Sequence, residues 1–374
     1  MVAGGCVSIT RLALVYAVNA LTESRIGTVD TGRSPVQRGC FWKRPMERIA
    51  VMSDKTGIAW TDATWNPVTG CSKVSQGCKN CYAEREWGRL SANPKAMAYY
   101  GRAFTDIACH EDRLDQPLRW KKPRMIFVNS MSDLFHEDVP DDFIDRVFAV
   151  MALAENHTFQ VLTKRPERML RWFDPGFDNR EHAVGQAMRE IGAARGGEDA
   201  GLPEWPLPNV WLGVSVEDQA TADERIPPLL QTPAAVRWVS AEPILGRIDL
   251  EHVQLDEDTY YNALTGDSLM LSRTIIPMEN TLSWVVCGGE SGNSARALDA
   301  HHLRPLIKQC QKSGTPVFVK QLGYRFMDLD TVFYGAGVPT TDNARRLTHR
   351  AGANMDEWPE DLRVREWPKA LSHE

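Results

Sequence analysis

The sequence predicts an α/β protein that is built as a partial or complete parallel (β/α) barrel with loop insertions. Short apolar runs rich in β-branched residues alternate with stretches of helical period, which is typical of βαβ units around a parallel sheet. Each apolar run is followed directly by a polar cluster, as at the carboxyl edge of a barrel, where such folds hold their chemistry. The composition is that of a globular protein, with 43% hydrophobic and 25% charged residues over 374 positions.

Seven segments are expected to form the strands of this sheet. The first begins within residues 57–64, and the others are Met125–Asn129, Phe159–Thr163, Val210–Val216, Val236–Ser240, Trp284–Cys287 and Val317–Lys320. Residues 141–155 and 303–310 place apolar side chains at helical spacing, so both should be covering helices. Another helix should begin near Ala83.

The pattern of apolar and polar residues divides the chain into three parts. Residues 1–51 carry seven Lys and Arg against three acids and show no sustained period. We therefore expect a disordered extension, or upstream sequence read through from an early start. Residues 52–323 should hold the barrel, and residues 324–374 should cap it. Segments 178–208 and 251–282 interrupt the alternation and are expected to be loop insertions.

Composition and charge exclude several classes of function. The chain has 43 Lys and Arg against 49 Asp and Glu, and the net charge of −6 disfavours a general polyanion binder while leaving room for a local basic patch. No apolar run reaches the roughly 18 residues of a membrane span, so no membrane association is expected. Eight cysteines are too few for a disulfide scaffold in a chain of this length, so we expect a reducing, cytoplasmic location.

Three cysteines are the strongest chemical signal in the sequence. Cys71, Cys78 and Cys81 fall within eleven residues, and thiolates bind both zinc and iron–sulfur clusters. A structural zinc site prefers four protein ligands. Its distant fourth donor would be Cys109, His110 or Cys287. A [4Fe–4S] cluster on three thiolates leaves one iron open to a small molecule, which suits a barrel mouth. The third alternative is three unrelated buried cysteines.

Polar residues that follow the strands are the candidates for catalysis. They are Asp133, His136, Lys164, Glu217 and Glu242. Asp133 and His136 could move protons or contact substrate, or they could be a helix cap and a surface histidine. Lys164, with Arg165 beside it, could hold phosphates or a carboxylate, or belong to a solvated helix face.

Two further segments are candidates for ligand binding. Gly288, Gly289, Glu290 and Ser291 follow a late strand and suit a ligand that needs close backbone approach and a carboxylate partner. A basic run around Trp120 could contact nucleic acid or be solvated surface. Its cations are Arg119, Lys121, Lys122 and Arg124. Cys287, at a strand end, is expected to be a small buried apolar residue.

Several ordered motifs resemble the phage-associated three-Cys-motif family. They are Gly57–Pro67, the three cysteines, Asn129–His136, Gln160–Pro166 and Gly288–Gly292. The resemblance covers most of residues 53–323 and also Trp358–Pro368, and chains of that family typically start near the position of Met52. It implies a separate three-Cys-motif protein as a partner.

That family is in turn similar to radical S-adenosylmethionine (SAM) enzymes and, more distantly, to spore photoproduct lyases. Those enzymes usually carry C-x3-C-x2-C and a Gly-Gly-Glu after an early strand, whereas this chain has C-x6-C-x2-C and its Gly-Gly-Glu follows a late strand. The resemblance implies a [4Fe–4S] cluster on Cys71, Cys78 and Cys81, SAM on the open iron and on Gly288–Ser291, and radical modification or repair of nucleic acid. The alternative is a zinc- or cluster-stabilised protein that binds nucleic acid or a partner without catalysis.

Overall fold

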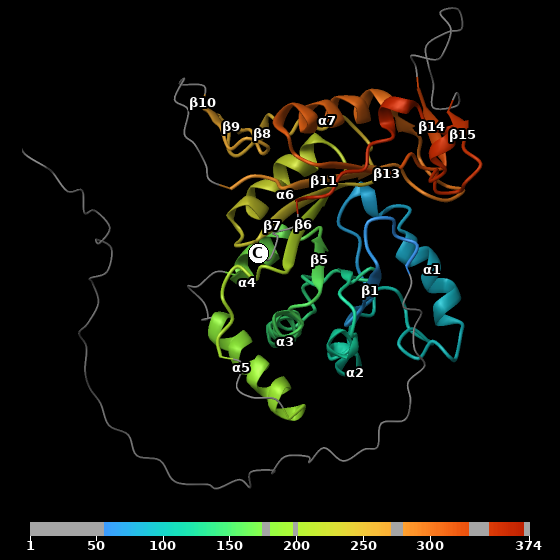
Figure 1. Cartoon of the computed structure of the whole chain (residues 1–374). Coiled ribbons are helices and arrows are strands. Elements are labelled where there is room, and N and C mark those ends of the chain that lie inside the picture. Colours follow the sequence, from blue (N-terminus) through green and yellow to red (C-terminus); the bar gives the residue numbers. More distant parts are fainter. Residues whose placement is uncertain (1–55, 174–179, 197–200, 271–279, 329–343, 370–374) are drawn as a thin grey trace, which may run out of the picture. The chain divides into compact units, whose positions relative to one another are not determined.

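The structure is a computed structural model that describes residues 56–173, 180–196, 201–270, 280–328 and 344–369. These residues belong to one compact unit, residues 51–374. The expectation for residues 1–51 lies outside the described residues. At the centre of the unit is a seven-stranded sheet in the order β1-β4-β5-β6-β7-β11-β13 (Figure 1).

All neighbouring strands of this sheet are parallel. The strands are β1 Ala63–Trp65, β4 Met125–Val128, β5 Thr158–Thr163, β6 Val210–Val216, β7 Val236–Ala241, β11 Trp284–Gly288 and β13 Val317–Gln321. Their order in space is their order in the chain, and β1 and β13 remain the two edges, so the sheet curls into an open half-barrel. The predicted parallel α/β fold is confirmed, in its partial form.

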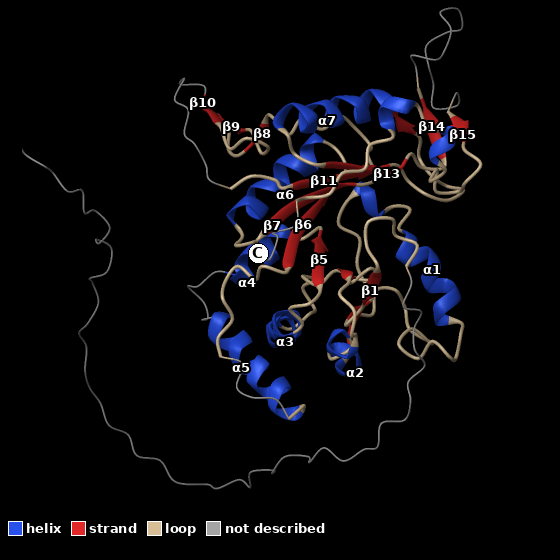
Figure 2. Cartoon of the chain, in the orientation of Figure 1, coloured by secondary structure: helices blue, strands red, loops and turns tan. Residues whose placement is uncertain are grey.

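Helices pack on one face of the sheet (Figure 2). They are α3 Asp141–Leu153, α4 Pro166–Phe173, α6 Gln219–Gln231 and α7 Ala300–Ser313, while α2 Glu111–Leu114 is a single turn. The predicted helices at 141–155 and 303–310 are confirmed. Phe143 and Val147, one turn apart on α3, are fully buried, as their helical spacing requires. No helix in the described part of the chain is long and apolar enough to cross a bilayer.

The opposite, concave face of the sheet carries a layer of tryptophans. Trp211, Trp238 and Trp284 come from three neighbouring strands, and Trp60 packs against the last two with ring centroids 5.3 and 6.1 Å apart. Gly213 makes room for this layer, because a Cβ there would lie 2.6 Å from the Trp238 indole. The rings form a packed apolar floor, above which the strands continue to their polar carboxyl ends.

Both predicted insertions lie outside the seven-stranded sheet and contain regular structure that the sequence did not reveal. The first contains α5 Arg180–Ala194, which packs against α3 and buries Val184 and Met188. The second forms a small antiparallel sheet of β8 Val253–Gln254, β9 Thr259–Tyr261 and β10 Ser268–Met270. The helix was missed because only a narrow stripe of α5 is buried, which leaves its apolar period weak.

The C-terminal tail covers the edge strand β13. Val319 donates its backbone N–H to the Val364 carbonyl at 2.9 Å, and Glu366 donates to the Val317 carbonyl at 3.0 Å. Pairing of this kind shields an edge that would otherwise be open to other chains. Nearby, β12 Leu298–Asp299, β14 Arg325–Met327 and β15 Arg345–Arg346 form a separate small sheet.

Candidate functional site

The three cysteines lie on residues 70–82, here called the cysteine loop. It follows β2 Val68–Thr69, which pairs with β3 Ala108–Cys109. Gly70 turns the chain with a φ of +95°, and a Cβ there would lie 2.3 Å from the Asp106 carbonyl oxygen, so no side chain fits. The loop then passes through the short 3-10 helix Gln76–Cys78 and ends at α1 Tyr82–Ser91, close to the predicted helix start.

All three thiols of the loop are free and half-buried. Burial raises the pKa of the Cys71 thiol to about 12, with Asp133 adding to the rise and Arg165 opposing it. Cys81 is the N-cap residue of α1, and its side chain makes no capping hydrogen bond. Three thiols on one loop, with no imidazole or carboxylate among them, are the donor set that iron–sulfur clusters take.

Among the described residues, which include Cys71, Cys78 and Cys81, no group of three or more His, Cys, Asp or Glu side chains is arranged to hold a metal ion. His110 shares a hydrogen bond with the Thr69 hydroxyl at 2.7 Å, and Cys287 lies in the apolar core with its thiol 3.7 Å from the Phe318 carbonyl. Cys287 is therefore a packing residue, as its position at a strand end suggested.

Arg165 ties the start of the cysteine loop to the end of β5. Its guanidinium donates to the Ser72 carbonyl at 3.2 Å and to the Ser72 hydroxyl at 2.8 Å, and it lies 3.9 Å from the Cys71 sulfur. The same group donates to Asp133 at 3.1 Å. Arg165 is only 8% exposed, so these contacts replace its hydration and fix the beginning of the loop.

Asp133 accepts a hydrogen bond from the Arg165 guanidinium and helps to fix its position. Its two oxygens accept hydrogen bonds from four donors at 2.7–3.1 Å. The donors are the Thr163 hydroxyl, the backbone N–H groups of Phe135 and Lys164, and the Arg165 guanidinium. A buried carboxylate with four donors has no need of a further partner. Asp133 therefore acts as a positioning residue in this structure.

His136 lies beside the loop on the same side as Asp133. Its Nδ1 accepts the backbone N–H of Asp138 at 3.1 Å, so the proton of the neutral ring sits on Nε2 and is donated to the Ser72 hydroxyl at 2.8 Å. Burial lowers the pKa of His136, and the positive charge of Arg165 lowers it further. The imidazole thus contacts the residue next to Cys71.

Glu217 holds the middle of the cysteine loop to the end of β6. It is 1% exposed and accepts hydrogen bonds from Ser75 at 3.1 Å and from Arg225 at 3.2 Å. Lys164 forms an ion pair with the same carboxylate. Gly77 makes this approach possible, because a Cβ there would lie 2.3 Å from a Glu217 oxygen.

Glu290 holds the last part of the loop to the segment after β11. It accepts hydrogen bonds from Asn80 at 2.9 Å and from the Arg296 guanidinium at 2.7 Å. Burial alone would raise the pKa of Glu290, but the hydrogen bonds from Arg296 and Asn80 outweigh it, so the pKa lies below its usual value. Asn80 also donates to the Ser294 carbonyl at 2.9 Å.

The two glycines before Glu290 have a packing role. A Cβ at Gly289 would lie 2.4 Å from the Leu322 carbonyl oxygen, and one at Gly288 would lie 2.8 Å from the Gln321 carbonyl oxygen. The two glycines thus allow close backbone packing against Gln321, the last residue of β13, and Leu322 after it; the approach of a ligand to this motif stays a prediction.

Glu242 completes the row of polar residues at the carboxyl edge. Its carboxylate accepts from the Ser240 hydroxyl at 3.0 Å and pairs with Lys320, at the end of β13, at 3.0 Å. Its carbonyl accepts from the Ser215 hydroxyl at 3.2 Å. The strand-end residues predicted to share one mouth thus follow strands along one edge of the sheet. Lys164 contacts both Asp133 and Glu217, whereas Glu290 contacts Asn80 and Arg296.

The basic run of residues 119–124 lies elsewhere. It precedes β4 and therefore belongs to the amino end of the sheet, away from the cysteine loop. Arg119 pairs with Asp115 at 2.6 Å, and the Arg124 guanidinium lies 4.8 Å above the Trp120 ring. One face of the only aromatic ring of this run is therefore already covered.

The sequence did not reveal the residues that hold the loop in place. Ser72, Ser75 and Asn80 lie between the cysteines, and each contacts a different strand end. The signal that could have found them is their type, because hydroxyl and amide groups next to thiolate ligands are natural partners for the polar strand ends.

The fold and this site define a class: an α/β half-barrel protein with a three-cysteine loop fixed at the carboxyl edge of its sheet. The chain belongs to the DUF5131 family of proteins of unknown function, whose family model matches residues 55–360. Neither the comparison with curated proteins nor the one with solved structures gave a match.

Proposed function

We propose that the protein is an iron–sulfur enzyme of the radical SAM type that acts on nucleic acid, by modification or repair. The observation that supports this most strongly is the cysteine loop. Three free, half-buried thiols lie on one short segment that is fixed over the carboxyl edge of a parallel half-barrel. Enzymes built on parallel barrels bind substrate at this edge.

Cys71, Cys78 and Cys81 would hold a [4Fe–4S] cluster. When bound, such a cluster with an open iron supplies the electron that cleaves SAM reductively. Arg165 lies 3.9 Å from the Cys71 sulfur, and its charge favours the more negative state of whatever this thiolate binds. Gly288, Gly289, Glu290 and Ser291 are the proposed SAM segment. The Ser291 hydroxyl has no hydrogen-bond partner within the described part of the chain, whereas the Glu290 carboxylate accepts a hydrogen bond from the Arg296 guanidinium.

His136, Lys164 and Glu242 are the residues proposed to contact substrate. The Lys164 side chain is 21% exposed and lies between β5 and β6, so an anionic group that enters the mouth can compete with Glu217 for it. Asp133 and Glu217 are proposed to position Arg165 and Lys164. A separate three-Cys-motif protein as partner, and a cytoplasmic location, belong to the same proposal.

A second function is favoured by one observation. Asp133, Glu217 and Glu290 are all engaged in internal contacts, which suits a loop with a purely structural role. The protein would then be a zinc- or cluster-stabilised binder of nucleic acid or of a partner protein, without catalysis.

SAM cleavage separates these two functions. The full chain, reconstituted with iron and sulfide under anaerobic conditions, is mixed with dithionite and SAM, and 5′-deoxyadenosine is measured by chromatography. We expect product from the wild type and from Cys109→Ala, which removes another half-buried cysteine, and none from Cys78→Ala. A cluster-loaded protein that neither binds nor cleaves SAM, even with nucleic acid added, would favour the binding protein.

A further inference from the structure

A cavity of about 700 Å³ opens beside Cys81. It is lined by the end of the cysteine loop with the start of α1, by the loop that follows Glu290, and by residues 349–351. This volume is within the roughly 300–1,000 Å³ of small-molecule sites. None of the strand-end residues Asp133, Lys164, Glu217, Glu242 and Glu290 lines the cavity, which shares with the site described above the end of the cysteine loop and Ser291.

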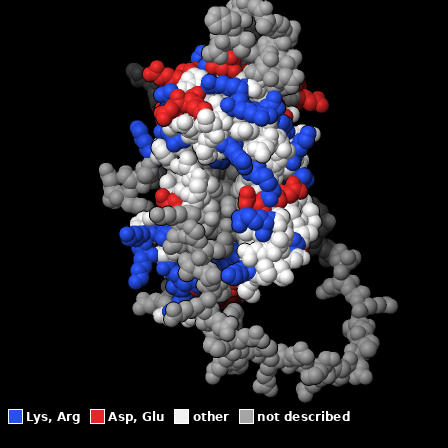
Figure 3. All heavy atoms as spheres, turned by 90° about the vertical axis from the view of Figure 1, so that its right-hand side faces the viewer, with Lys and Arg blue, Asp and Glu red and all other residues white. Residues whose placement is uncertain are grey.

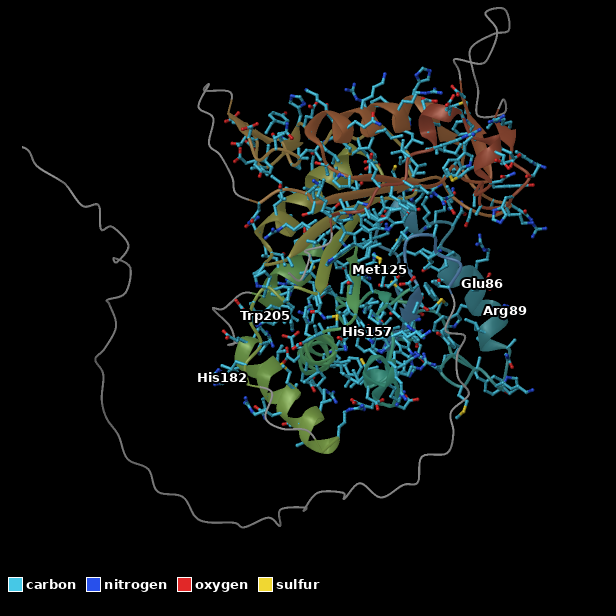
Figure 4. The ribbon with its side chains drawn as sticks, in the orientation of Figure 1. Glu86, Arg89, Met125, His157, His182 and Trp205 are labelled. Carbon is cyan, nitrogen blue, oxygen red and sulfur yellow. The ribbon has the colours of Figure 1, made fainter. Side chains whose placement is uncertain are left out.

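The acidic side chains that line the cavity are already neutralised. Glu84 pairs with Lys73 at 2.7 Å, and Glu86 pairs with Arg89 at 3.1 Å. Glu86 and Arg89 both project from α1 (Figure 4), and neither Lys73 nor Arg89 lines the cavity. The two carboxylates therefore contribute little net negative charge to it.

The basic side chains of the lining are not neutralised in this way. Lys79, Arg85 and Arg350 are exposed, and none of them pairs with a carboxylate among the residues that the structure describes. Arg85 donates to the Ser291 carbonyl at 3.0 Å. Gly292 allows this contact, because a Cβ there would lie 2.3 Å from the Arg85 guanidinium. Figure 3, which faces this side of the molecule, shows Lys and Arg side chains interspersed with Asp and Glu side chains.

The lining also indicates what kind of anion fits. Ser291, Asn293 and Ser294 add hydroxyl and amide donors, and the imidazole of His349 is the one aromatic ring among the residues that line the cavity. The ligand would therefore be held mainly by charge and hydrogen bonds. Several donors around two guanidinium groups suit the oxygens of a phosphate, which accept forked hydrogen bonds from arginine.

We infer that this cavity binds a phosphate group, held by Lys79, Arg85 and Arg350 next to Cys81. The site goes beyond the proposed function, because it rests on the cavity and its charges and stands whether or not the cysteines hold a cluster. The phosphate belongs either to a nucleic-acid strand or to a free nucleotide, and the two sources share this chemistry.

Binding to the full chain tests the inference. A labelled single-stranded oligonucleotide is titrated by fluorescence anisotropy, and adenosine monophosphate by calorimetry. Lys79→Glu and Arg350→Glu reverse a charge of the lining at exposed positions, so the fold should survive, and thermal melting checks this. We expect each variant to weaken binding about tenfold or more and to reduce the salt dependence by about one phosphate contact. Lys95→Glu, an exposed lysine outside the lining, should bind within about twofold of the wild type.

Each result leads to a conclusion. Binding of the oligonucleotide without the mononucleotide identifies a nucleic-acid strand as the ligand, and binding of the mononucleotide at a similar or lower concentration identifies a free nucleotide. The inference is overturned if the folded chain binds neither probe. It is equally overturned if the two lining variants bind like the wild type, or if Lys95→Glu loses as much affinity as they do.

Discussion

Arg165 should hold the start of the cysteine loop on the sheet, and its replacement should release it. Arg165→Ala removes the donors that reach Ser72 at 2.8 and 3.2 Å and Asp133 at 3.1 Å. Arg165→Lys keeps a positive charge near Asp133 but cannot make the forked contact with Ser72. The two variants therefore separate the effect of charge from the effect of geometry.

The size of the effect follows from burial. Removing one partner of a buried ion pair costs about 3–5 kcal/mol, because the remaining charge is left unpaired. Asp133 keeps three other donors, so we expect the lower end, about 3 kcal/mol, for Arg165→Ala. Arg165→Lys loses mainly the bonds to Ser72, and at about 1 kcal/mol for each bond we expect a loss of about 2 kcal/mol.

Urea unfolding of the metal-free full chain measures these differences. Arg171→Ala is the matched control, because this arginine is 66% exposed and its nearest acid, Glu137, is 3.8 Å away; we expect a loss below about 0.5 kcal/mol. Hydrogen exchange of residues 71–73 should be faster in Arg165→Ala and in Arg165→Lys, because both lose the bonds to Ser72, and unchanged in Arg171→Ala. Equal unfolding midpoints for Arg165→Ala and Arg171→Ala, at equal slopes, would refute the idea that Arg165 fixes the loop.

Two further changes test the floor of the barrel and the response to acid. Gly213→Ala places a methyl group 2.6 Å from the Trp238 indole and should lower the free energy of unfolding by about 1–3 kcal/mol. The control Gly88→Ala on α1, where a Cβ has nothing within 4 Å, should raise it by up to about 1 kcal/mol. Equal urea midpoints for the two variants would argue against the tryptophan layer. Burial lowers the pKa of His110 to about 4, with Arg113 adding to the effect, so the unfolded chain takes up this proton at a higher pH than the folded one. His110 thus contributes stability above about pH 6.5 that is lost as the pH falls towards 4, and the loss is about 2 kcal/mol after allowance for partial exposure. His110→Gln should make the free energy of unfolding less dependent on pH in this window. An unchanged pH dependence would contradict the low pKa.

The parallel sheet could be predicted because its strands are short apolar runs. Val210–Val216 is buried at every position, and a strand that is buried on both faces has to be apolar throughout. The first strand was harder to locate, because β1 has only three residues. Trp60 lies just before β1 and belongs to the tryptophan layer. It is apolar because it packs on the concave face of the sheet, so it does not mark a strand.

The edge of the candidate site could also be predicted, because the carboxyl ends of parallel strands share one edge. The contacts that fix the loop could not. The bond from Arg165 to Ser72 spans 93 positions and that from Asn80 to Glu290 spans 210. Such pairs depend on where the strand ends lie relative to one another in three dimensions, and a single sequence carries no signal of that arrangement. Glu290 illustrates the consequence, because its motif suggested a carboxylate for a ligand and its oxygens bind Arg296 and Asn80.

The metal content of the reconstituted chain tests the central claim most directly. Iron, sulfide and zinc are measured after anaerobic reconstitution of the wild type, of Cys78→Ala and of Cys109→Ala. A cluster on Cys71, Cys78 and Cys81 predicts about four irons and four sulfides per chain in the wild type and in Cys109→Ala, and a loss of both in Cys78→Ala. One zinc per chain without iron, lost in both variants, would contradict the cluster and identify a zinc site that includes Cys109.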